Sequence, residues 1–301
     1  MASTANIMHK GLGDRIFDGI NNTLLVFLGF SMLFPFYVVL INSISPPEDF
    51  RFKSIILFPS KIELAYYQTV FSVGSRIFQA FSVTLFITFV GTAVNMVLTL
   101  MGAYAMSQKK MPMRSGITLF IVFTMYFSGG MIPTYLVVKE IGLTNTLWAM
   151  IIPSAVSSGT LIFMRNFIMG IPAEIIESAT IDGCSDLRVL LNIILPLSSA
   201  AIATFTLFYA VGHWNEFYAG VIYVTKQKLQ PLQVYLRWVL YDATTTNDFS
   251  EIERYLNDGI KPPTEALRAA TIMAATLPIV LVYPFLQKYF VKGMIMGSLK
   301  G

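Results

Sequence analysis

Long hydrophobic stretches without charged residues alternate with shorter polar segments along the chain. Six such stretches contain no Asp, Glu, Lys or Arg, and each holds the roughly 20 residues that a helix needs to cross a bilayer. A transmembrane β-barrel would instead show segments of about ten residues with alternating polarity, and this pattern does not occur. We therefore predict an all-α membrane protein with six transmembrane helices. The six stretches cover residues 19–47, 77–108, 115–138, 141–164, 189–215 and 269–287.

The composition supports a membrane protein. Hydrophobic residues make up 55% of the chain and charged residues 13%, with a mean hydropathy of +0.64, whereas a soluble domain carries about 25% charged residues. The first stretch must be distinguished from a secretory signal peptide. Its apolar part, residues 24–41, is longer than the apolar region of a signal peptide, and no small-residue cleavage site follows it before residues 46–47. We therefore expect it to be the first membrane span.

The distribution of basic residues orients the predicted helices. The short segment 108–114 contains Lys109, Lys110 and Arg114 without an acidic residue, and the C-terminal segment contains three lysines. Short basic loops remain in the cytoplasm, whereas long mixed loops have less influence on orientation. Both termini are therefore predicted to be cytoplasmic. The expected organisation is a cytoplasmic segment 1–19, a six-helix domain 20–290 with an outer loop at about 224–268, and a cytoplasmic tail 291–301.

Few residues are suited to metal or nucleotide chemistry. The chain has one cysteine, Cys184, and two histidines, His9 and His213, that are far apart in sequence. These do not make a zinc site, and we predict no metal site and no resident cofactor. The phosphate-binding motif Gly-x-x-x-x-Gly-Lys-Ser/Thr is absent from the sequence. If ATP drives this protein, another subunit must bind the ATP and Mg²⁺.

A polar segment between the fourth and fifth stretches predicts a short helix at a membrane face, from Pro172 to Asp182. Proline stands at its start, acidic residues occupy its first turns, and Gly183 stands where the helix would stop. Residues 175, 176 and 179 would form one apolar face, with Glu174, Glu177 and Asp182 elsewhere. An ordinary interfacial helix is the alternative, but such helices are usually basic and this one is acidic.

The same segment resembles a known motif. Glu177-x-Ala-x-x-x-Gly183, followed after nine residues by Ile-x-Leu-Pro, resembles the coupling loop of permease subunits of binding-protein-dependent ABC importers. The resemblance implies that this helix, within a coupling loop of about 165–197, sits in a cleft of a cytoplasmic ATPase. Glu177 would meet a basic group there, and the small residue at position 179 would permit close approach. Ser178 and Cys184 replace the alanines that are commonest in the family. The implied coupling residues are Glu174, Glu177, Ser178, Ala179, Asp182, Gly183, Leu195 and Pro196.

The resemblance extends over nearly the whole chain. Residues 214–217, Trp-Asn-Glu-Phe, are similar to a motif of MalG-like carbohydrate permeases, and residues 283–301 are similar to the ends of LplC/YtcP-type subunits. It implies that Trp214, Asn215 and Glu216 line the translocation path or its outer gate; the alternative is an interfacial belt that includes His213. It also implies a second ATPase contact in the tail, the alternative being a frayed terminus. The tail residues concerned are Gly297, Lys300 and Gly301.

Other polar and special residues give further expectations. Asn95, midway along the second stretch, predicts a hydrogen bond between helices. Four prolines in or near the spans predict kinks. A Ser-x-x-Glu capping box at 250–253 predicts a short helix in the outer loop. Aromatic residues before it are expected to lie at the membrane interface, with sugar stacking as the alternative. The four prolines are Pro133, Pro153, Pro278 and Pro284. The aromatic residues are Tyr235, Trp238 and Tyr241.

Taken with the resemblance, these features predict a permease subunit of an ATP-driven importer in the bacterial cytoplasmic membrane. It is expected to move oligosaccharides or polysaccharide fragments, with a second permease subunit, two ATPase subunits and an extracytoplasmic binding protein as partners. It is not expected to be an enzyme. A channel or secondary transporter is the alternative, although we find no internal repeat. An intramembrane enzyme would need paired catalytic groups, and only His213 and Glu216 come near this. The net charge of +4 is compatible with acidic sugars, but basic residues also set membrane topology.

Overall fold

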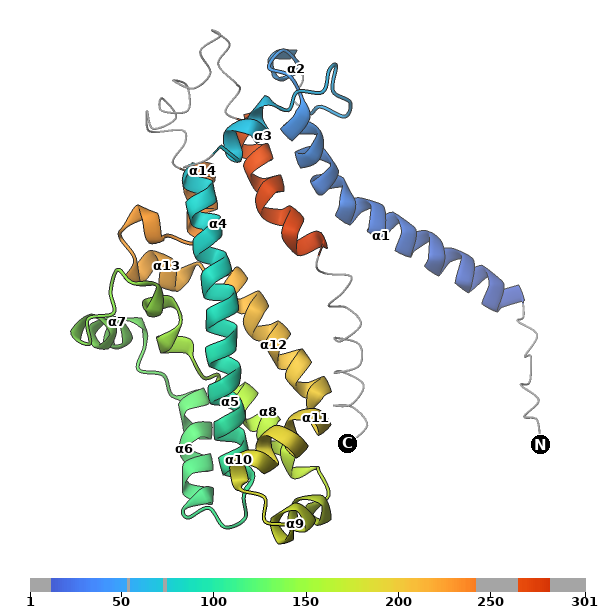
Figure 1. Cartoon of the computed structure of the whole chain (residues 1–301). Coiled ribbons are helices and arrows are strands. Elements are labelled where there is room, and N and C mark those ends of the chain that lie inside the picture. The colour runs from blue at the N-terminus through green and yellow to red at the C-terminus, as the bar shows by residue number, and fades with distance from the viewer. Residues whose placement is uncertain (1–11, 53–54, 73–74, 242–264, 282–301) are drawn as a thin grey trace. The chain divides into compact units, whose positions relative to one another are not determined.

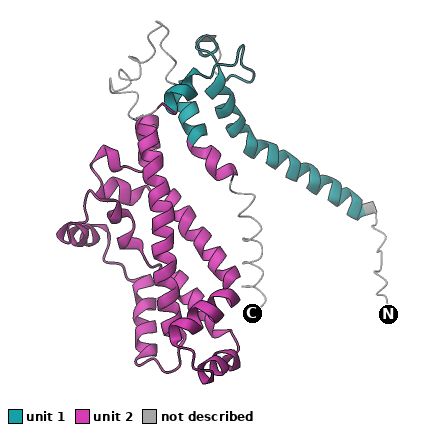
Figure 2. Cartoon of the chain, in the orientation of Figure 1, with its two compact units in different colours: residues 1–70, 250–274 teal, residues 71–249, 275–301 magenta. Residues whose placement is uncertain are grey.

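Every regular element in the described part of the chain is a helix. The structure is a computed structural model that describes residues 12–52, 55–72, 75–241 and 265–281 (Figure 1). The prediction of an all-α protein is confirmed for these residues. The chain divides into two compact units (Figure 2). Unit 1 contains Met1–Val70 and Ser250–Ala274, and unit 2 contains Phe71–Phe249 and Ala275–Gly301.

Unit 1 contains the long helix α1 (Leu12–Ile44), which corresponds to the first predicted span. Its apolar side chains are exposed over most of its length, as expected for a helix surrounded by lipid or by other chains. The C-terminal end of α1 is tied to the following segment, because Ser43 Oγ lies 2.7 Å from the Tyr67 hydroxyl and the Glu63 N–H donates to the Ile44 carbonyl at 2.8 Å. The short helices α2 (Asp49–Phe52) and α3 (Ala65–Val70) complete this segment.

A helix over residues 265–281 begins the last predicted span, and residues 265–274 of it belong to unit 1. Small side chains on this helix are buried, which permits close approach of neighbouring backbone. These buried residues are Ala266, Ala269, Ala270, Ala274 and Ala275.

Unit 2 is built around one continuous helix of 32 residues, Arg76–Ser107, which matches the second predicted span. A π-helical turn interrupts its regular hydrogen bonding near the middle. Such turns insert one extra residue and often mark functional positions. The parts of this helix are α4 (Arg76–Phe86), the π-turn η1 (Ile87–Gly91) and α5 (Thr92–Ser107).

The next three predicted spans are not straight helices but bent pairs of shorter ones. The third stretch forms α6 (Arg114–Tyr126) and α7 (Met131–Glu140), bent by 115°. The fourth forms the 3₁₀ turns η2 (Leu147–Met150) and η3 (Ile152–Ser154) and then α8 (Ser158–Met169), bent by 52°. The fifth forms α10 (Asp186–Val189), the π-turn η4 (Leu190–Ile194) and α11 (Leu195–Leu197), bent by 86° against α12 (Ser199–Trp214).

The positions of these breaks only partly follow the prolines. The break before α7 falls at Gly130, whose φ of +90° is open to glycine but not to most residues. The break expected near Pro133 therefore lies three residues earlier, because Pro133 itself is in the first turn of α7, where a missing N–H breaks no hydrogen bond. Pro153 does lie next to a break, in η3. The described part of the chain thus contains two helices long enough to cross a membrane, or up to five spans if each bent pair is counted as one.

Several short helices in the described part of the chain were not predicted, and the longest of them is α14. Helix α14 (Leu232–Tyr241) lies in the segment expected to be an outer loop and follows α13 (Tyr218–Tyr223) and η5 (Gln227–Leu229). It is held against α4, because the Leu232 N–H donates to Thr84 Oγ1 at 2.8 Å and the Arg76 guanidinium lies 4.6 Å from the centroid of the Trp238 ring. The helix predicted at 250–253, Pro284 and the tail residues Gly297, Lys300 and Gly301 lie outside the described residues.

Candidate functional site

The acidic segment between α8 and α10 forms the predicted short helix. Helix α9 (Ala173–Ile181) is preceded by Pro172 and carries Glu174 in its first turn. It ends in a Schellman motif, since the Cys184 N–H donates to the Ala179 carbonyl and the Gly183 N–H donates to the Thr180 carbonyl, at 3.0 and 3.1 Å. Gly183 has a φ of +81°. The helix and its glycine stop are therefore confirmed, and the chain turns back there because glycine accepts the left-handed conformation.

Part of the predicted apolar face of α9 packs inside its own unit. Ala179 is buried and Ile176 is partly buried against the core of unit 2, so these two residues face the chain's own helices, whereas Ile175 is exposed. A helical wheel does not show which neighbour an apolar face meets, and here the nearest core belongs to the same chain. The outward face is mixed: it carries Glu174, Glu177, Ser178 and Asp182, with Ile181 85% exposed.

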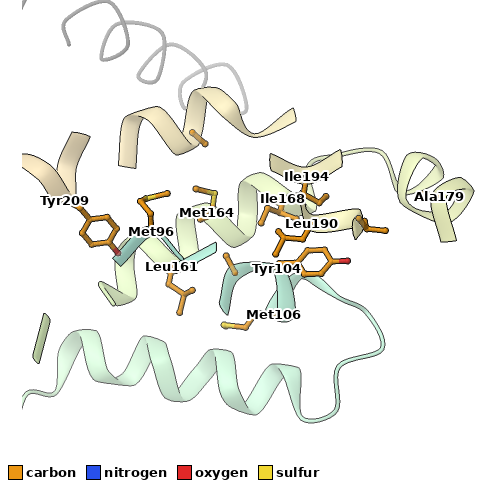
Figure 3. Close-up of a cluster of buried hydrophobic side chains, with 13 residues drawn as sticks. Met96, Tyr104, Met106, Leu161, Met164, Ile168, Ala179, Leu190, Ile194 and Tyr209 are labelled. Carbon is orange, nitrogen blue, oxygen red and sulfur yellow. The ribbon is translucent and has the colours of Figure 1, made fainter. Parts of the chain in front are cut away.

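A continuous hydrophobic core connects α9 to the middle of unit 2 (Figure 3). Starting from Ala179, it passes through side chains of α8 and of the α10–η4 segment and reaches α5 and Tyr209 of α12 (Figure 3). Protein cores are close-packed and transmit displacement, so α9 is mechanically joined to helices that cross the unit. The core residues along this route are Ile168, Val189, Leu190, Ile194, Met164, Leu161 and Met96.

Two buried polar pairs join α5 to α12. Asn95 Nδ2 lies 3.1 Å from His213 Nε2, and Thr99 Oγ1 lies 2.8 Å from the Tyr209 hydroxyl, which also accepts from the Ser157 N–H at 3.2 Å. The members of each helix are four residues apart and therefore lie on one face. The hydrogen bond predicted for Asn95 is confirmed. Each buried hydrogen bond contributes roughly 1 kcal/mol, and leaving one partner unpaired costs more.

The interfacial belt offered as the alternative does not describe His213. It is only 4% exposed and does not belong to an interfacial belt. Its ring fits against Gly91 at the end of the π-turn, where a Cβ atom would lie 2.5 Å from His213 Nε2. The spacing of these polar residues could have predicted the pairing of the two helices. Asn95 and Thr99 are four residues apart, as are Tyr209 and His213, so each pair lies on one face of its helix.

The segment Leu195–Pro196 lies at a corner rather than on α9. Leu195 is half-buried and Pro196 is exposed, and the helix axis turns by 86° between α11 and α12. Pro196 occupies the first turn of α11, where proline is tolerated, directly after the π-turn η4. These two residues therefore shape the return from α9 into the unit, and they do not share its exposed outward face.

Trp214, which ends α12, and the two residues that follow it do not share one surface. Trp214 is buried and meets the Phe81 ring edge-on, with centroids 5.9 Å apart. Asn215 is exposed, and its Nδ2 donates to the Val211 carbonyl at 3.0 Å. Glu216 Oε1 accepts from the Ala219 N–H at 2.9 Å in the first turn of α13. Trp214 thus packs inside the unit, which differs from both the predicted path lining and the predicted belt.

Glu216 is a helix cap in this structure. Burial raises the pKa of its carboxyl group, and hydrogen bonds from the backbone of Ala219 and Phe217 oppose that rise. We predict that Glu216→Gln, which keeps an acceptor oxygen, retains transport, whereas Glu216→Ala lowers the free energy of unfolding by about 1 kcal/mol, as for loss of a helix cap. Thermal unfolding in detergent and sugar uptake measure the two effects. Loss of uptake in Glu216→Gln with unchanged stability would instead indicate that the charge acts in the path or gate.

The geometry so far defines a helical membrane protein with an acidic helix displayed beside a bundle of bent spans. The sequence matches the family described as the binding-protein-dependent transport system inner membrane component over residues 1–296. The chain belongs to this family. The resemblance found in the 177–196 motif is thereby confirmed, and the chain is a transport component rather than an intramembrane enzyme.

Individual relatives are similar over almost their whole length. The chain is 42% identical over 296 residues to Protein LplC of Bacillus subtilis (strain 168), covering 98% of both chains. It is 40% identical over 289 residues to the polygalacturonan/rhamnogalacturonan transport system permease protein YtcP of the same organism, covering 96% of this chain and 99% of YtcP. Among solved structures, it is similar to a chain of a bacterial ABC transporter involved in the import of the acidic polysaccharide alginate. That match has a TM-score of 0.86 and 29% identity, and it covers 94% of this chain and 99% of the other.

Proposed function

We propose that this chain is one of two permease subunits of an ATP-driven importer in the bacterial cytoplasmic membrane. The complex would also contain a similar but distinct second permease, two ATPase subunits and an extracytoplasmic solute-binding protein. ATP and Mg²⁺ would bind to the ATPase subunits, and this chain would catalyse no reaction. Membership of the binding-protein-dependent transport family and the form of α9 support this assembly.

Six membrane spans with both termini in the cytoplasm are the topology that we propose. Two continuous helices and three bent pairs supply up to five spans, and the helix over 265–281 would begin the sixth. This arrangement places α9 and the basic segment 108–114 on the cytoplasmic side, where short basic loops are retained.

Helix α9 is proposed to be the element that contacts the ATPase. Its outward face offers Glu174, Glu177, Ser178 and Asp182 to a partner, and its inward face is fixed by Ala179 and the Schellman turn. Closure of the ATPase dimer would displace α9, and the close-packed core would carry α8 and the α10–η4 segment with it. The observation that carries this proposal is that α9 has two different faces. One is acidic and exposed, and the other is buried in the core of unit 2.

The polar pairs then determine which helices move together. Asn95 with His213 and Thr99 with Tyr209 hold α5 and α12 as one body. Changes of shape would occur at the breaks near Gly130 and Pro196, in the manner of a hinge. Asn215, which is exposed just beyond α12, remains our proposed contact with the path or outer gate. A second ATPase contact through Gly297, Lys300 and Gly301 also remains a proposal.

Oligosaccharides or fragments of polysaccharides are the proposed cargo. YtcP belongs to a polygalacturonan/rhamnogalacturonan transport system, and the similar solved transporter imports alginate. The test is to purify the complete complex and measure ATP hydrolysis with the binding protein and galacturonan, alginate or neutral oligosaccharides. Stimulation by one of these classes would identify the cargo. A chain that transports sugar after reconstitution without an ATPase would support a channel or secondary transporter instead.

A charge reversal on α9 tests the docking surface. We predict that Glu177→Lys reduces co-purification of the ATPase by at least about ten-fold, because losing a paired charge at an interface costs about 2–5 kcal/mol. The matched control is Glu140→Lys, the same change at an exposed position at the end of α7. The amount of ATPase recovered with each tagged variant is the measurement. Equal recovery with both variants would remove Glu177 from the proposed contact.

A further inference from the structure

A cavity of about 550 Å³, open to the surface over much of its extent, lies beside α6 and α8, away from the polar pairs described above. Two arginines from different helices, Arg114 at the start of α6 and Arg165 on α8, contribute to its wall. Helices α6 and α8 contact each other directly. The cavity is lined by Arg114, Ser115, Thr118, Leu119, Val122 and Arg165.

The two guanidinium groups keep donor capacity for a ligand. Arg165 Nε donates to the Met106 carbonyl at 3.1 Å and its Nη1 to Asn166 Oδ1 at 3.2 Å, while Arg114 Nη2 lies 3.4 Å from Met169 Sδ. A guanidinium has five N–H donors, so several remain on each side chain. Among the residues described, no Asp or Glu forms an ion pair with either arginine. The cavity therefore carries two positive charges that a bound anion would balance.

The remaining lining defines what kind of anion fits. Ser115 adds a hydroxyl group near Arg114, whereas the Thr118 hydroxyl donates to the Arg114 carbonyl at 2.8 Å. Leu119 and Val122 place aliphatic side chains one to two turns further along α6. Arginine recognises phosphate through paired hydrogen bonds. A saccharide would need hydroxyl partners throughout the site, whereas here one end of the lining is apolar. The cavity thus combines a phosphate-binding end with a hydrocarbon end.

We propose that this cavity binds an anionic phospholipid, with its phosphate group between Arg114 and Arg165 and the start of an acyl chain along Leu119 and Val122. Basic pockets between membrane helices on the cytoplasmic side suit anionic head groups, because that leaflet carries negative lipids. Arg114 follows the basic pair Lys109–Lys110, which adds to the positive potential at this end of α6. This lipid site rests on the proposed function, which places the basic segment 108–114 on the cytoplasmic side.

A lipid bound in this cavity would join helices α6 and α8 close to α9. Arg165 also holds the α5 end through the Met106 carbonyl, and α8 leads directly into α9. A phosphate bound by both arginines would join α6 to α8 next to the helix that we propose to meet the ATPase. Bound lipid would therefore stiffen the part of unit 2 that receives the ATPase movement.

The test uses the complete purified complex in nanodiscs that contain phosphatidylglycerol and phosphatidylcholine with the same acyl chains. Native mass spectrometry measures how many of each lipid remain bound after release. We expect wild type to retain phosphatidylglycerol, and Arg114→Gln/Arg165→Gln to retain it about 25-fold less, since each arginine contributes about five-fold. The control, Lys139→Gln/Lys226→Gln, removes two exposed basic residues away from the cavity and should retain lipid as wild type does.

A further variant tests the apolar end of the cavity, and competition experiments test other ligands. Val122→Trp fills the apolar end without changing charge and should also reduce lipid retention. Equal retention by the arginine pair variant and the lysine control would overturn the proposal. Displacement of the lipid by millimolar inorganic phosphate would also overturn it and identify a free-phosphate site, and displacement by alginate oligosaccharide would identify a substrate site. Sugar-stimulated ATP hydrolysis, measured in parallel, tests the importer function separately from the lipid site.

Discussion

Gly183→Val is expected to lower transport by at least about ten-fold while the chain still inserts into the membrane. Gly183 has a φ of +81°, and an L-residue in this conformation costs roughly 1–2 kcal/mol, with β-branched residues the least suited. Nothing lies within 4 Å of a Cβ atom placed there, so the effect comes from the backbone and not from a clash. The strain would change how α9 ends and displace Glu177 and Ser178 from the ATPase. Uptake and sugar-stimulated ATP hydrolysis are the measurements.

Gly142 supplies a matched control for this experiment. It has a φ of +74° at the end of α7, and a Cβ atom there also meets nothing within 4 Å. Gly142→Val should therefore introduce similar strain without affecting coupling. Gly183→Asn should recover much of the activity, because Asn tolerates the left-handed region better than other side chains. Normal uptake by Gly183→Val, or equal loss in Gly142→Val, would count against a specific role of the α9 turn.

Gly91→Ala is expected to lower the free energy of unfolding of the complex by about 1–3 kcal/mol, the usual effect of overfilling a packed interior. A Cβ atom at Gly91 would lie 2.5 Å from His213 Nε2, so the imidazole must move. Because His213 is buried and bonded to Asn95, its movement leaves two buried polar groups without their partner. The temperature of unfolding in detergent measures the change.

A double substitution separates this contact from a general loss of helix packing. In the His213→Ala background the Cβ of Gly91→Ala has room, so the second substitution should cost much less than it does in wild type. Gly116→Ala is the control for a glycine inside a helix, because a Cβ there meets nothing within 4 Å. It should be neutral or slightly stabilising. Equal destabilisation by Gly91→Ala in both backgrounds would show that His213 is not the group displaced.

The hydrophobic pattern located the apolar helical segments of the described residues but not their breaks. Hydropathy averages over many residues, so it does not register a single backbone dihedral such as that of Gly130 or a change of hydrogen bonding such as the π-turn before Pro196. The break expected near Pro133 lies at Gly130 for a different reason: proline limits a helix only where an N–H is needed. The positions of these apolar segments were therefore predictable, and their bends were not.

The candidate site was predictable where local chemistry determines local structure. Proline, early acids and glycine specify α9 almost alone, so its limits were found. The burial of Ala179 depends instead on how α8, which precedes α9, and the α10–η4 segment, which follows it, pack in a common core. His213 was missed because its neighbour Trp214 suggested an interface, whereas both side chains are buried in unit 2. Asn95 was found because an amide within a span needs a partner.

Cross-linking from a single cysteine on α9 tests the coupling role most directly. The chain has one cysteine, so Cys184→Ser leaves none, and Ser178→Cys then places a thiol on the exposed face of α9. In membranes that contain the whole complex, a short bifunctional reagent should join this position to the ATPase, while a cysteine at the exposed position Glu140 should give no such product. An ATPase adduct from Ser178→Cys alone is the predicted result. A complex that transports sugar normally, yet gives no adduct from Ser178→Cys, would contradict the assignment of α9 as the coupling helix.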